Sequence, residues 1–456
     1  MKILAEGGQK RFAIFAAVWG TIFTFLILPW QGPDEYSHID MIGSTLGIYG
    51  FSDILKADMD LDEHRLRWNP NGREDGRIEL KQVISAMFQK PDYKRSDCLP
   101  RGISIGIVSH LPAAVGMEIG ILLGLPTYWV MILGRLCMLM VYIFLCSVAL
   151  ALMPMRKEVL EITMLLPMCM QQAASLSYDG VLLPVSFLFI AYIFYLKYEA
   201  DRVGIREVLV SVLLLFTIAI AKIPYVVMGG LVLLIPVEKI DISLGRVKIT
   251  GSVIHKARWL IVSACVAAVA GIVYIGRNNM YIRVVCASLA NPWATIRLLG
   301  RTWIVWSEDI FLSFAGNFGW KDAPVGTWFV ATVVALLLVT SVMRIADSDL
   351  SEYTLSIMDR VIICLVWVSC FYLVALSMVP FTVDYQSDDW SRTIRGMLAI
   401  SGIQGRYFVP VVPLMMMIMP YLVDMRDRIF KRFISIWYVF ACIYTSGVII
   451  WRYWKL

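Results

Sequence analysis

Long apolar runs, separated by short polar or charged segments, alternate along most of this chain. A helix needs about 20 mostly apolar residues to cross a bilayer, and runs of that kind recur between Phe12 and Trp451. About eleven runs are predicted to cross a membrane. They cover residues 12–30, 126–153, 158–177, 181–198, 207–221, 224–238, 257–276, 326–344, 359–380, 406–424 and 431–452. The pattern predicts an all-α polytopic membrane protein, with a single transmembrane domain over residues 1–456.

The composition indicates the same class. Of the 456 residues, 59% are hydrophobic and 17% are charged, and the mean hydropathy is +0.70. The formal charge of +6 does not indicate a nucleic-acid partner, because the Lys and Arg residues are spread over short loops, where they set topology. Most of the nine cysteines lie inside apolar runs, where Cys behaves as a small hydrophobe. Cys98 and Cys286 lie in predicted outer loops, so a disulfide between them is left open.

Charges in the loops predict the orientation. Lys10 and Arg11 precede the first run, which places the N-terminus in the cytoplasm by the positive-inside rule. Residues 31–125 then form the first extracytoplasmic loop, and residues 277–325 and 381–405 form two further ones.

One apolar run, residues 102–124, fits a membrane span poorly. It contains His110, Pro112 and Glu118, which are costly at membrane depth. We therefore expect an interfacial or re-entrant helix on the outer side. This choice keeps Asp179 on the outer face, together with the first loop.

Titratable residues gather at the outer ends of the predicted spans. They are Asp34, Glu35, His38, Arg135, Asp179, Lys222 and Arg406. Each has a simpler interpretation: the two acids could solvate a turn, Asp179 could cap a helix with Ser177, and the cations could reach lipid headgroups. Arg135 lies well inside its helix, so a purely structural role for it requires a buried partner. Lys222 also interrupts two short apolar runs, and such breaks often mark binding sites in membrane proteins.

As a set, these residues suit one chemistry. A lipid-linked phosphosugar offers an anionic phosphate at headgroup depth, which Lys222, Arg406 or Arg135 can bind. A carboxylate at the same depth can accept the proton of an incoming hydroxyl group. Displacement at an anomeric carbon needs both the base and a stabilised phosphate leaving group.

Five motifs resemble a known family. They are QGPDEYSHI after the first run, HLPAAVG before the second, MQQAASLSYDG after the third, GNFGW in a late loop and QGRYFVPVVPL at the start of a late run. Over about residues 12–425, the chain resembles the DUF2142 family of predicted bacterial membrane proteins. That family is itself similar to the GT-C superfamily of glycosyltransferases, which use polyprenyl-phosphate sugars.

The resemblance implies a GT-C-like fold in the bacterial cytoplasmic membrane, with juxtamembrane helices in the first outer loop. It implies a catalytic acid at Asp34, next to Glu35, and a second acidic position at Asp179, which helps to bind a divalent metal in some GT-C enzymes. His110 stands where an aromatic residue is expected, so acceptor contacts at that position stay open.

The sequence therefore predicts an inverting glycosyltransferase that acts on the outer face. Its partners would be a polyprenyl-phosphate sugar donor, a cell-envelope glycan or lipid-linked acceptor, and membrane lipids. The proposed roles are Asp34 as general base, with Glu35 and His38 supporting it; Lys222, Arg406 and Arg135 on the donor phosphate; and Asp179, Tyr225, Gln404 and Tyr407 on substrate. A divalent metal, Mg²⁺ or Mn²⁺, on Asp34 and Asp179 is left open. The alternatives are a flippase or transporter, or a non-catalytic assembly partner, for lipid-linked glycans.

Overall fold

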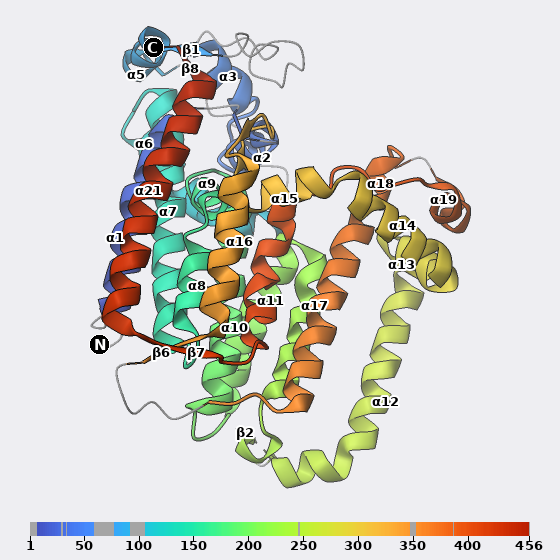
Figure 1. Ribbon diagram of the computed structural model, residues 1–456. Helices are drawn as coiled ribbons and strands as arrows, with labels where there is room; N and C mark the ends of the chain where they lie inside the picture. The colour runs from blue at the N-terminus through green and yellow to red at the C-terminus, as the bar shows by residue number, and fades with distance from the viewer. Residues whose placement is uncertain are drawn as a thin grey trace.

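Helices that run between two ends of an elongated bundle make up most of the molecule (Figure 1). The computed structural model describes residues 7–28, 31–32, 34–58, 77–91, 105–244, 247–346, 353–385 and 387–455. The first helix, α1 (Gly7–Leu26), lies beside the last one, α21 (Asp427–Tyr453), and both run from the lower end in Figure 1 to the upper end. The C-terminus is therefore at the upper end, opposite the start of α1.

The apolar runs of the sequence coincide with the elements of the bundle. Between α1 and α21 these are α7 (Thr127–Leu152), α8 (Lys157–Met164) with α9 (Pro167–Ala173), α10 (Asp179–Tyr198), α11 (Ile205–Ala221), the 3₁₀ helix η2 (Ile223–Leu234), α12 (Gly251–Ile275), α16 (Thr327–Val342), α17 (Ile357–Ser377), and η4 (Gly405–Val411) with α20 (Val412–Met417). Within the described ranges, four helical stretches are long and apolar enough to cross a membrane: Thr127–Leu152, Asp179–Tyr198, Ile357–Thr382 and Asp427–Tyr453. The prediction of an all-α, membrane-type protein is thus confirmed.

Shorter elements lie at the two ends of the bundle. At the upper end are α2 (Glu35–Thr45), α3 (Phe51–Asp58), α5 (Leu80–Phe88), η1 (Ile105–His110), α6 (Leu111–Leu122), α13 (Met280–Ala290), α14 (Pro292–Val305), α15 (Ser307–Ala315), α18 (Val379–Thr382) and α19 (Trp390–Gly396). The one-turn helix η3 (Val237–Lys239) follows η2. Strands occur in two-stranded pairs: β1 (Ile78–Glu79) with β8 (Trp454–Lys455), β2 (Asp241–Leu244) with β3 (Val247–Thr250), β4 (Asn317–Phe318) with β5 (Ala323–Pro324), and β6 (Met343–Ala346) with β7 (Val423–Arg426).

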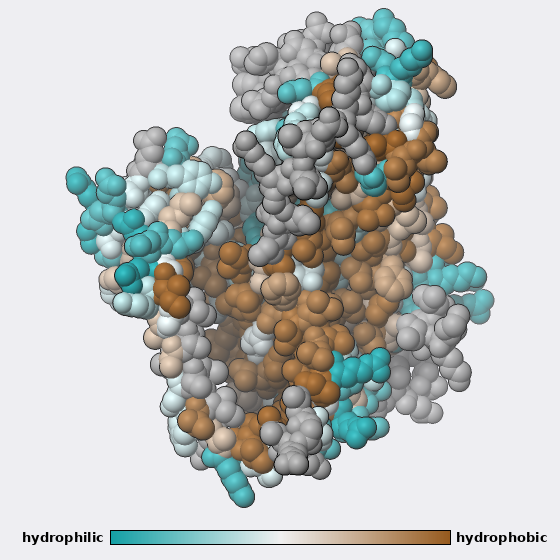
Figure 2. All heavy atoms as spheres, turned by 180° about the vertical axis from the view of Figure 1, so that it is seen from behind, coloured by the Kyte–Doolittle hydropathy of each residue, from teal (hydrophilic) through white to brown (hydrophobic). Residues whose placement is uncertain are grey.

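The outer surface of the bundle is apolar around its middle. Figure 2 shows hydrophobic side chains over the central part of one face, with hydrophilic ones toward the upper and lower ends. Exposed apolar side chains recur at helical spacing, for example Ile357, Val361, Leu365 and Val368 on α17. A soluble monomer rarely exposes such continuous apolar surface, so this band suits contact with lipid.

Helix α10 forms the centre of the bundle. Of its best membrane-spanning window, 89% is buried inside the protein, far more than in the other three long stretches. Helices α7, α9 and α11 pack around it. This burial holds the N-terminal end of α10, and with it Asp179, in a defined position toward the upper end.

The run that fitted a span poorly forms η1 and α6, and α6 packs closely against α7. A Cβ atom added at Gly116 would lie 2.4 Å from the carbonyl oxygen of Leu133, so only glycine permits this approach. Helix α6 has 12 residues, a length of about 18 Å, which is shorter than the roughly 30 Å hydrocarbon core. This length agrees with the predicted interfacial or re-entrant helix over residues 102–124, which stays a prediction.

Cys98 lies outside the described residues, so the disulfide with Cys286 of α13 also stays a prediction.

Candidate functional site

The first turn of α2 presents the two acidic residues that the sequence singled out. Asp34 is the N-cap of α2 in the left-handed region, with φ 58° and ψ 13°, which Asp tolerates better than most residues. Its backbone carbonyl accepts hydrogen bonds from the N–H groups of Ser37 at 3.0 Å and His38 at 3.2 Å. The side chain of Asp34 is exposed, whereas Glu35 is buried. The preceding Pro33, which the sequence suggested would end the first helix, lies outside the described residues.

Glu35 forms a buried ion pair with Arg135 of α7, with side chains 4% and 1% exposed. The same guanidinium donates to the carbonyl oxygens of Ile27 and Thr24, the latter at 3.3 Å. This is the buried partner that a structural role for Arg135 requires. The predicted binding of donor phosphate by Arg135 does not fit this arrangement, because Glu35 already neutralises its charge. The pair instead ties α2 to α7 and to the end of α1.

Two histidines meet beside this ion pair. The Nδ1 atom of His38 lies 3.0 Å from the Nε2 atom of His110, and the edge of Tyr178 packs against both rings, with centroids 5.4 and 6.2 Å away. His110 is only 2% exposed and His38 is half-buried. Burial lowers the pKa of His38 to about 3, and the charges of His110 and Arg406 add to this shift. His38 is therefore neutral near pH 7.

Lys222 and Arg406 both lie close to the ring of Tyr407. The Nζ atom of Lys222 lies 3.5 Å from the ring centroid, and the guanidinium carbon of Arg406 lies 5.5 Å from it. Over the described ranges, neither cation forms an ion pair, and the Nε atom of Arg406 is buried without a hydrogen-bond partner. Three other largely buried cations have carboxylate partners: Arg11 with Glu161, Lys197 with Asp359 and Arg452 with Asp322. Arg156, at the start of α8, is also buried and donates to the carbonyl oxygen of Met419. Lys222 and Arg406 therefore remain available to bind an anion beside Tyr407.

The turn that begins η4 is held tightly on its neighbours. The N–H group of Gly405 donates to the Oγ atom of Ser313 at 2.7 Å, and a Cβ atom at position 405 would lie 2.0 Å from the carbonyl oxygen of Ile310. The hydroxyl of Tyr225 donates to the carbonyl oxygen of Tyr407. Gln404 is the N-cap residue of η4 and is half-buried. These contacts fix the backbone that carries Arg406 and Tyr407.

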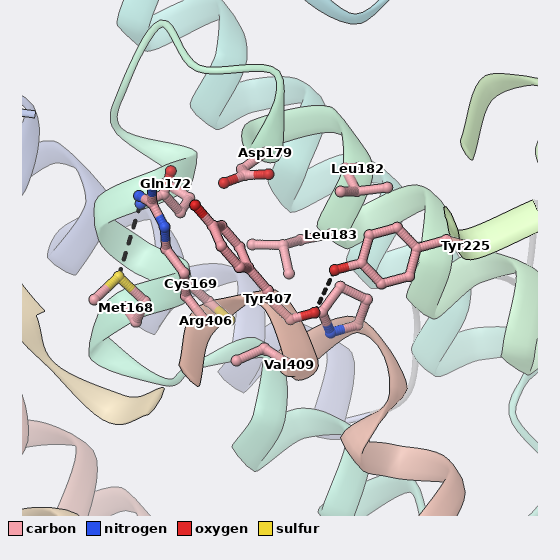
Figure 3. Close-up of a pocket in the computed structure, with 11 residues that line it drawn as sticks. Met168, Cys169, Gln172, Asp179, Leu182, Leu183, Tyr225, Arg406, Tyr407 and Val409 are labelled. Carbon is pink, nitrogen blue, oxygen red and sulfur yellow. Dashed lines mark hydrogen bonds between the residues drawn. The ribbon is translucent and has the colours of Figure 1, made fainter. Parts of the chain in front are cut away.

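Asp179 faces the same cations from the first turn of α10. Its side chain points toward Arg406 and Tyr407 (Figure 3), and its own N–H group donates to the Oγ atom of Ser177 at 3.3 Å. Ser177 is therefore the acceptor in this turn, and the carboxylate of Asp179 stays free of a capping role. Burial raises the pKa of the neighbouring Tyr178, and the negative charges of Asp179 and Asp34 add to this shift. Asp34 is thus electrically part of the site although its side chain is exposed.

Two small adjoining hollows lie between these groups. One is lined by Met168, Cys169, Gln172, Asp179, Leu182, Leu183, Tyr225, Arg406, Tyr407, Val409 and Pro410 (Figure 3). The other is lined by Gly32, Glu35, His38, Gln171, Gln172, Ser175, Ser177 and Arg406. Gln172 and Arg406 line both, so the cationic and the histidine sides of the site are neighbours. Among the described residues, no group of three or more His, Cys, Asp or Glu side chains is arranged to hold a metal ion.

Comparison with known families agrees with the membrane class. The family model DUF2142, described as a predicted membrane protein, matches residues 17–415. The chain belongs to the DUF2142 family. No curated protein and no solved structure matches it.

Residues 17–415 of this DUF2142 protein include every candidate site residue, from Asp34 to Tyr407. The structure brings the predicted groups together in two clusters: Glu35, His38 and Arg135 around α2, and Asp179, Lys222, Tyr225 and Tyr407 beside η4. Arg406 links the two. The sequence interpretation singled out His110 inside an apolar run but missed its contact with His38.

Proposed function

We propose that this chain is an inverting glycosyltransferase of the GT-C type, which transfers a sugar from a polyprenyl-phosphate donor to a cell-envelope glycan or lipid-linked acceptor. One observation carries the proposal: Lys222 and Arg406 both lie against the ring of Tyr407, neither forms an ion pair among the described residues, and Arg406 lines the same hollow as Asp179. Two cations that share one nearby carboxylate, Asp179, keep a net positive charge, which favours binding of an anion.

A phosphate group suits this arrangement in charge and in shape. The guanidinium of Arg406 can donate two parallel hydrogen bonds to phosphate oxygens, whereas Lys222 acts as a point charge. Both would stabilise the phosphate as it leaves the anomeric carbon with the bonding electron pair. Tyr225, Tyr407 and the apolar residues Leu182 and Leu183 offer the surface for the sugar or for the first prenyl units.

The proton acceptor would come from the first turns of α2. Asp34 is the candidate that the family resemblance implies, and His38 lines the second hollow. Either group would take the proton from the acceptor hydroxyl as its oxygen attacks the anomeric carbon. Participation of Mg²⁺ or Mn²⁺, with Asp34 and Asp179 as ligands, remains an open part of the proposal.

The proposed topology has about eleven membrane crossings, a cytoplasmic N-terminus and an extracytoplasmic active site in the bacterial cytoplasmic membrane. The directions of these helices support it: α1 and α21 run from the lower to the upper end in Figure 1, whereas α7 and α10, which α8 and α9 connect, run back to the lower end. Helix α8 with α9, and η4 with α20, each serve as one interrupted crossing in this scheme. The upper end of the bundle would then be the outer face.

A transporter or flippase for lipid-linked glycans is the second candidate. The short element η2 and the interrupted pair η4 and α20 lie beside the site, and interrupted spans of this kind line transport pathways. Lys222 and Arg406, however, lie together beside Tyr407 instead of being distributed across the depth of the bundle, which favours the enzyme. A non-catalytic partner in glycan assembly would use the same site for binding alone.

Assays of the purified protein in lipid nanodiscs distinguish these three functions. Transfer from a panel of radiolabelled polyprenyl-phosphate sugars to membrane acceptors supports the enzyme, and Arg406→Gln and Lys222→Gln should both reduce it. Arg301→Gln is the matched control, because Arg301 is exposed on α14, away from both hollows. Movement of a labelled lipid-linked sugar across the bilayer without transfer would support the transporter instead.

A further inference from the structure

We propose that His38, oriented by His110, is the group that accepts the proton of the incoming hydroxyl in this site. The catalytic role of His38 in this inference rests on the proposed glycosyl transfer. It also makes a claim about the two histidines that can be tested without any sugar donor.

The contact between the rings leaves one nitrogen of His38 available. Its Nδ1 atom lies 3.0 Å from the Nε2 atom of His110, so these two atoms share one proton. Among the residues that the structure describes, no group bonds the Nε2 atom of His38. His38 lines the second hollow, and Nε2 is its ring nitrogen that His110 does not occupy, so the proposal assigns the contact with the acceptor hydroxyl to this atom.

Two tautomeric arrangements satisfy this contact, and they differ in what His38 offers. If His38 donates from Nδ1 to His110, its Nε2 atom carries a lone pair and can accept a proton. If His110 donates from Nε2 instead, the Nε2 atom of His38 carries a hydrogen and can only donate. The proposal requires the first arrangement, in which both rings carry their hydrogen on Nδ1.

Asp34 is less well placed for this role. Its side chain is exposed, it lines neither hollow, and its backbone lies in the left-handed region at the N-cap of α2. Glu35 lines the second hollow, but Arg135 neutralises it. Of Asp34, Glu35 and His38, His38 is thus the neutral base.

Arg406 couples this base to the donor. The groups that face His38 are His110, Tyr178, Glu35 in its ion pair, and Arg406. Burial keeps the pKa of His38 low, and the positive charge of Arg406 lowers it further. A phosphate bound to Arg406 would cancel that second effect and raise the basicity of His38. The base would then be strengthened when the donor is present.

The chemical step balances on these residues. The acceptor oxygen forms a bond to the anomeric carbon while its proton moves to the Nε2 atom of His38. The bond between the anomeric carbon and the phosphate oxygen breaks, and its electron pair leaves with the phosphate toward Lys222 and Arg406. His38 becomes an imidazolium, whose Nδ1–H group donates to His110, and it later loses the added proton to solvent.

Nitrogen-15 NMR of the full chain in nanodiscs tests the tautomers. The chain has four histidines, so a His64→Gln, His255→Gln double variant leaves only the two rings of the pair. At pH 7 we expect both rings to be neutral and to carry hydrogen on Nδ1. Hydrogen on Nε2 of both rings, a mixed pattern or a charged His38 would each overturn the proposal.

Adding a short-chain polyprenyl phosphate tests the coupling in the same sample. We expect the pKa of His38 to rise when this lipid binds, and also in Arg406→Gln without the lipid. If the lipid binds and the pKa does not move, the coupling to Arg406 is wrong. If no polyprenyl phosphate binds at all, the proposed donor site is wrong. The tautomers seen by NMR still decide whether His38 can accept a proton.

Once a donor is identified, steady-state kinetics of variants can show whether His110 positions His38 or only supports the fold. We expect His38→Gln to lower kcat by a factor of about 10² to 10⁴, more than Asp34→Asn does. His110→Phe should lower kcat with little change in KM, and His110→Gln should recover part of the loss, because its amide oxygen can accept from the Nδ1–H group of His38. Equal effects of His110→Phe and His110→Gln, or a larger loss in Asp34→Asn than in His38→Gln, would contradict this assignment.

Discussion

Glu35 and Arg135 form an ion pair that is almost fully enclosed, although 100 positions separate them in the sequence. The pair joins the first turn of α2 to the first half of α7. Because Glu35 directly follows Asp34 and lies three residues before His38, the pair also sets the position of both candidate bases. A contact that looks purely structural therefore determines the geometry of the site.

Breaking this pair should destabilise the protein strongly. We expect Glu35→Gln to lower the free energy of unfolding by about 3–5 kcal/mol, because it leaves the guanidinium of Arg135 buried without a counter-charge. The measurement is unfolding in mixed detergent micelles. The double variant Glu35→Gln, Arg135→Met should lose less than Glu35→Gln alone, because it buries no unpaired charge.

The pair Lys431 and Asp427 on α21, in which the Lys431 side chain is 46% exposed, is the control for this comparison. Lys431→Gln should change the free energy of unfolding by less than about 1 kcal/mol, since exposed pairs contribute little. Equal effects at Lys431 and Glu35 would show that the enclosed pair does not stabilise α2 as we infer.

Removing either unpaired cation should weaken binding of a polyprenyl phosphate. We expect Lys222→Gln and Arg406→Gln each to raise the dissociation constant by about 10- to 100-fold, the effect of losing a charged hydrogen-bond partner. Native mass spectrometry or calorimetry in nanodiscs measures this binding. Arg301→Gln should bind as the wild type does, and a similar loss in all three variants would indicate non-specific attraction of the lipid.

Stability should fall at acid pH partly because of His38. Burial lowers the pKa of His38 to about 3 in the folded protein, whereas the unfolded imidazole has a pKa of about 6.5. Between these pH values the unfolded chain binds a proton that the folded chain does not. The free energy of unfolding therefore decreases as the pH falls, by about 1.4 kcal/mol per unit, and the contribution of His38 is complete above pH 6.5.

Comparing variants isolates this contribution. Between pH 7 and pH 5 the wild type should lose about 2 kcal/mol more than His38→Gln, which has no imidazole at this position. His255→Gln, with its change on the exposed side of α12, should lose as much as the wild type. If wild type and His38→Gln lose the same amount, His38 is not held neutral by its surroundings.

The sequence predicted the bundle because the length of an apolar run is a local property. The runs at 126–153 and 431–452 became α7 and α21 with nearly the same limits. The sequence interpretation missed an interruption: the run at 158–177 divides at Leu165 and Leu166 into α8 and α9, because Pro167, the first residue of α9, cannot continue α8.

The candidate site was predictable in its residue types but not in its pairings. Charged residues next to apolar runs identified Asp179, Lys222 and Arg406 without any contact information. The partners Glu35 with Arg135, and His38 with His110, depend on helix packing between segments distant in the sequence. Neither spacing nor composition encodes such contacts.

Gly405 should be essential for the position of Arg406. A Cβ atom there would meet the carbonyl oxygen of Ile310 at 2.0 Å and the backbone nitrogen of Phe314 at 2.6 Å, and backbone atoms cannot move aside as a flexible side chain does. We expect Gly405→Ala to push η4 away from α15 and to weaken binding of a polyprenyl phosphate by at least tenfold, alongside a stability loss of about 1–3 kcal/mol. Binding in nanodiscs and unfolding in micelles measure the two effects.

Gly300 offers the matched substitution, because nothing lies within 4 Å of a Cβ atom at that position in α14. Gly300→Ala should keep wild-type binding and stabilise the helix by up to about 1 kcal/mol, since alanine restricts the unfolded chain more than glycine does. If Gly405→Ala behaved like Gly300→Ala, the contact between η4 and α15 would not hold Arg406 in place. The guanidinium would then owe its position to Tyr407 and Asp179, and Asp179→Asn would become the variant that displaces it.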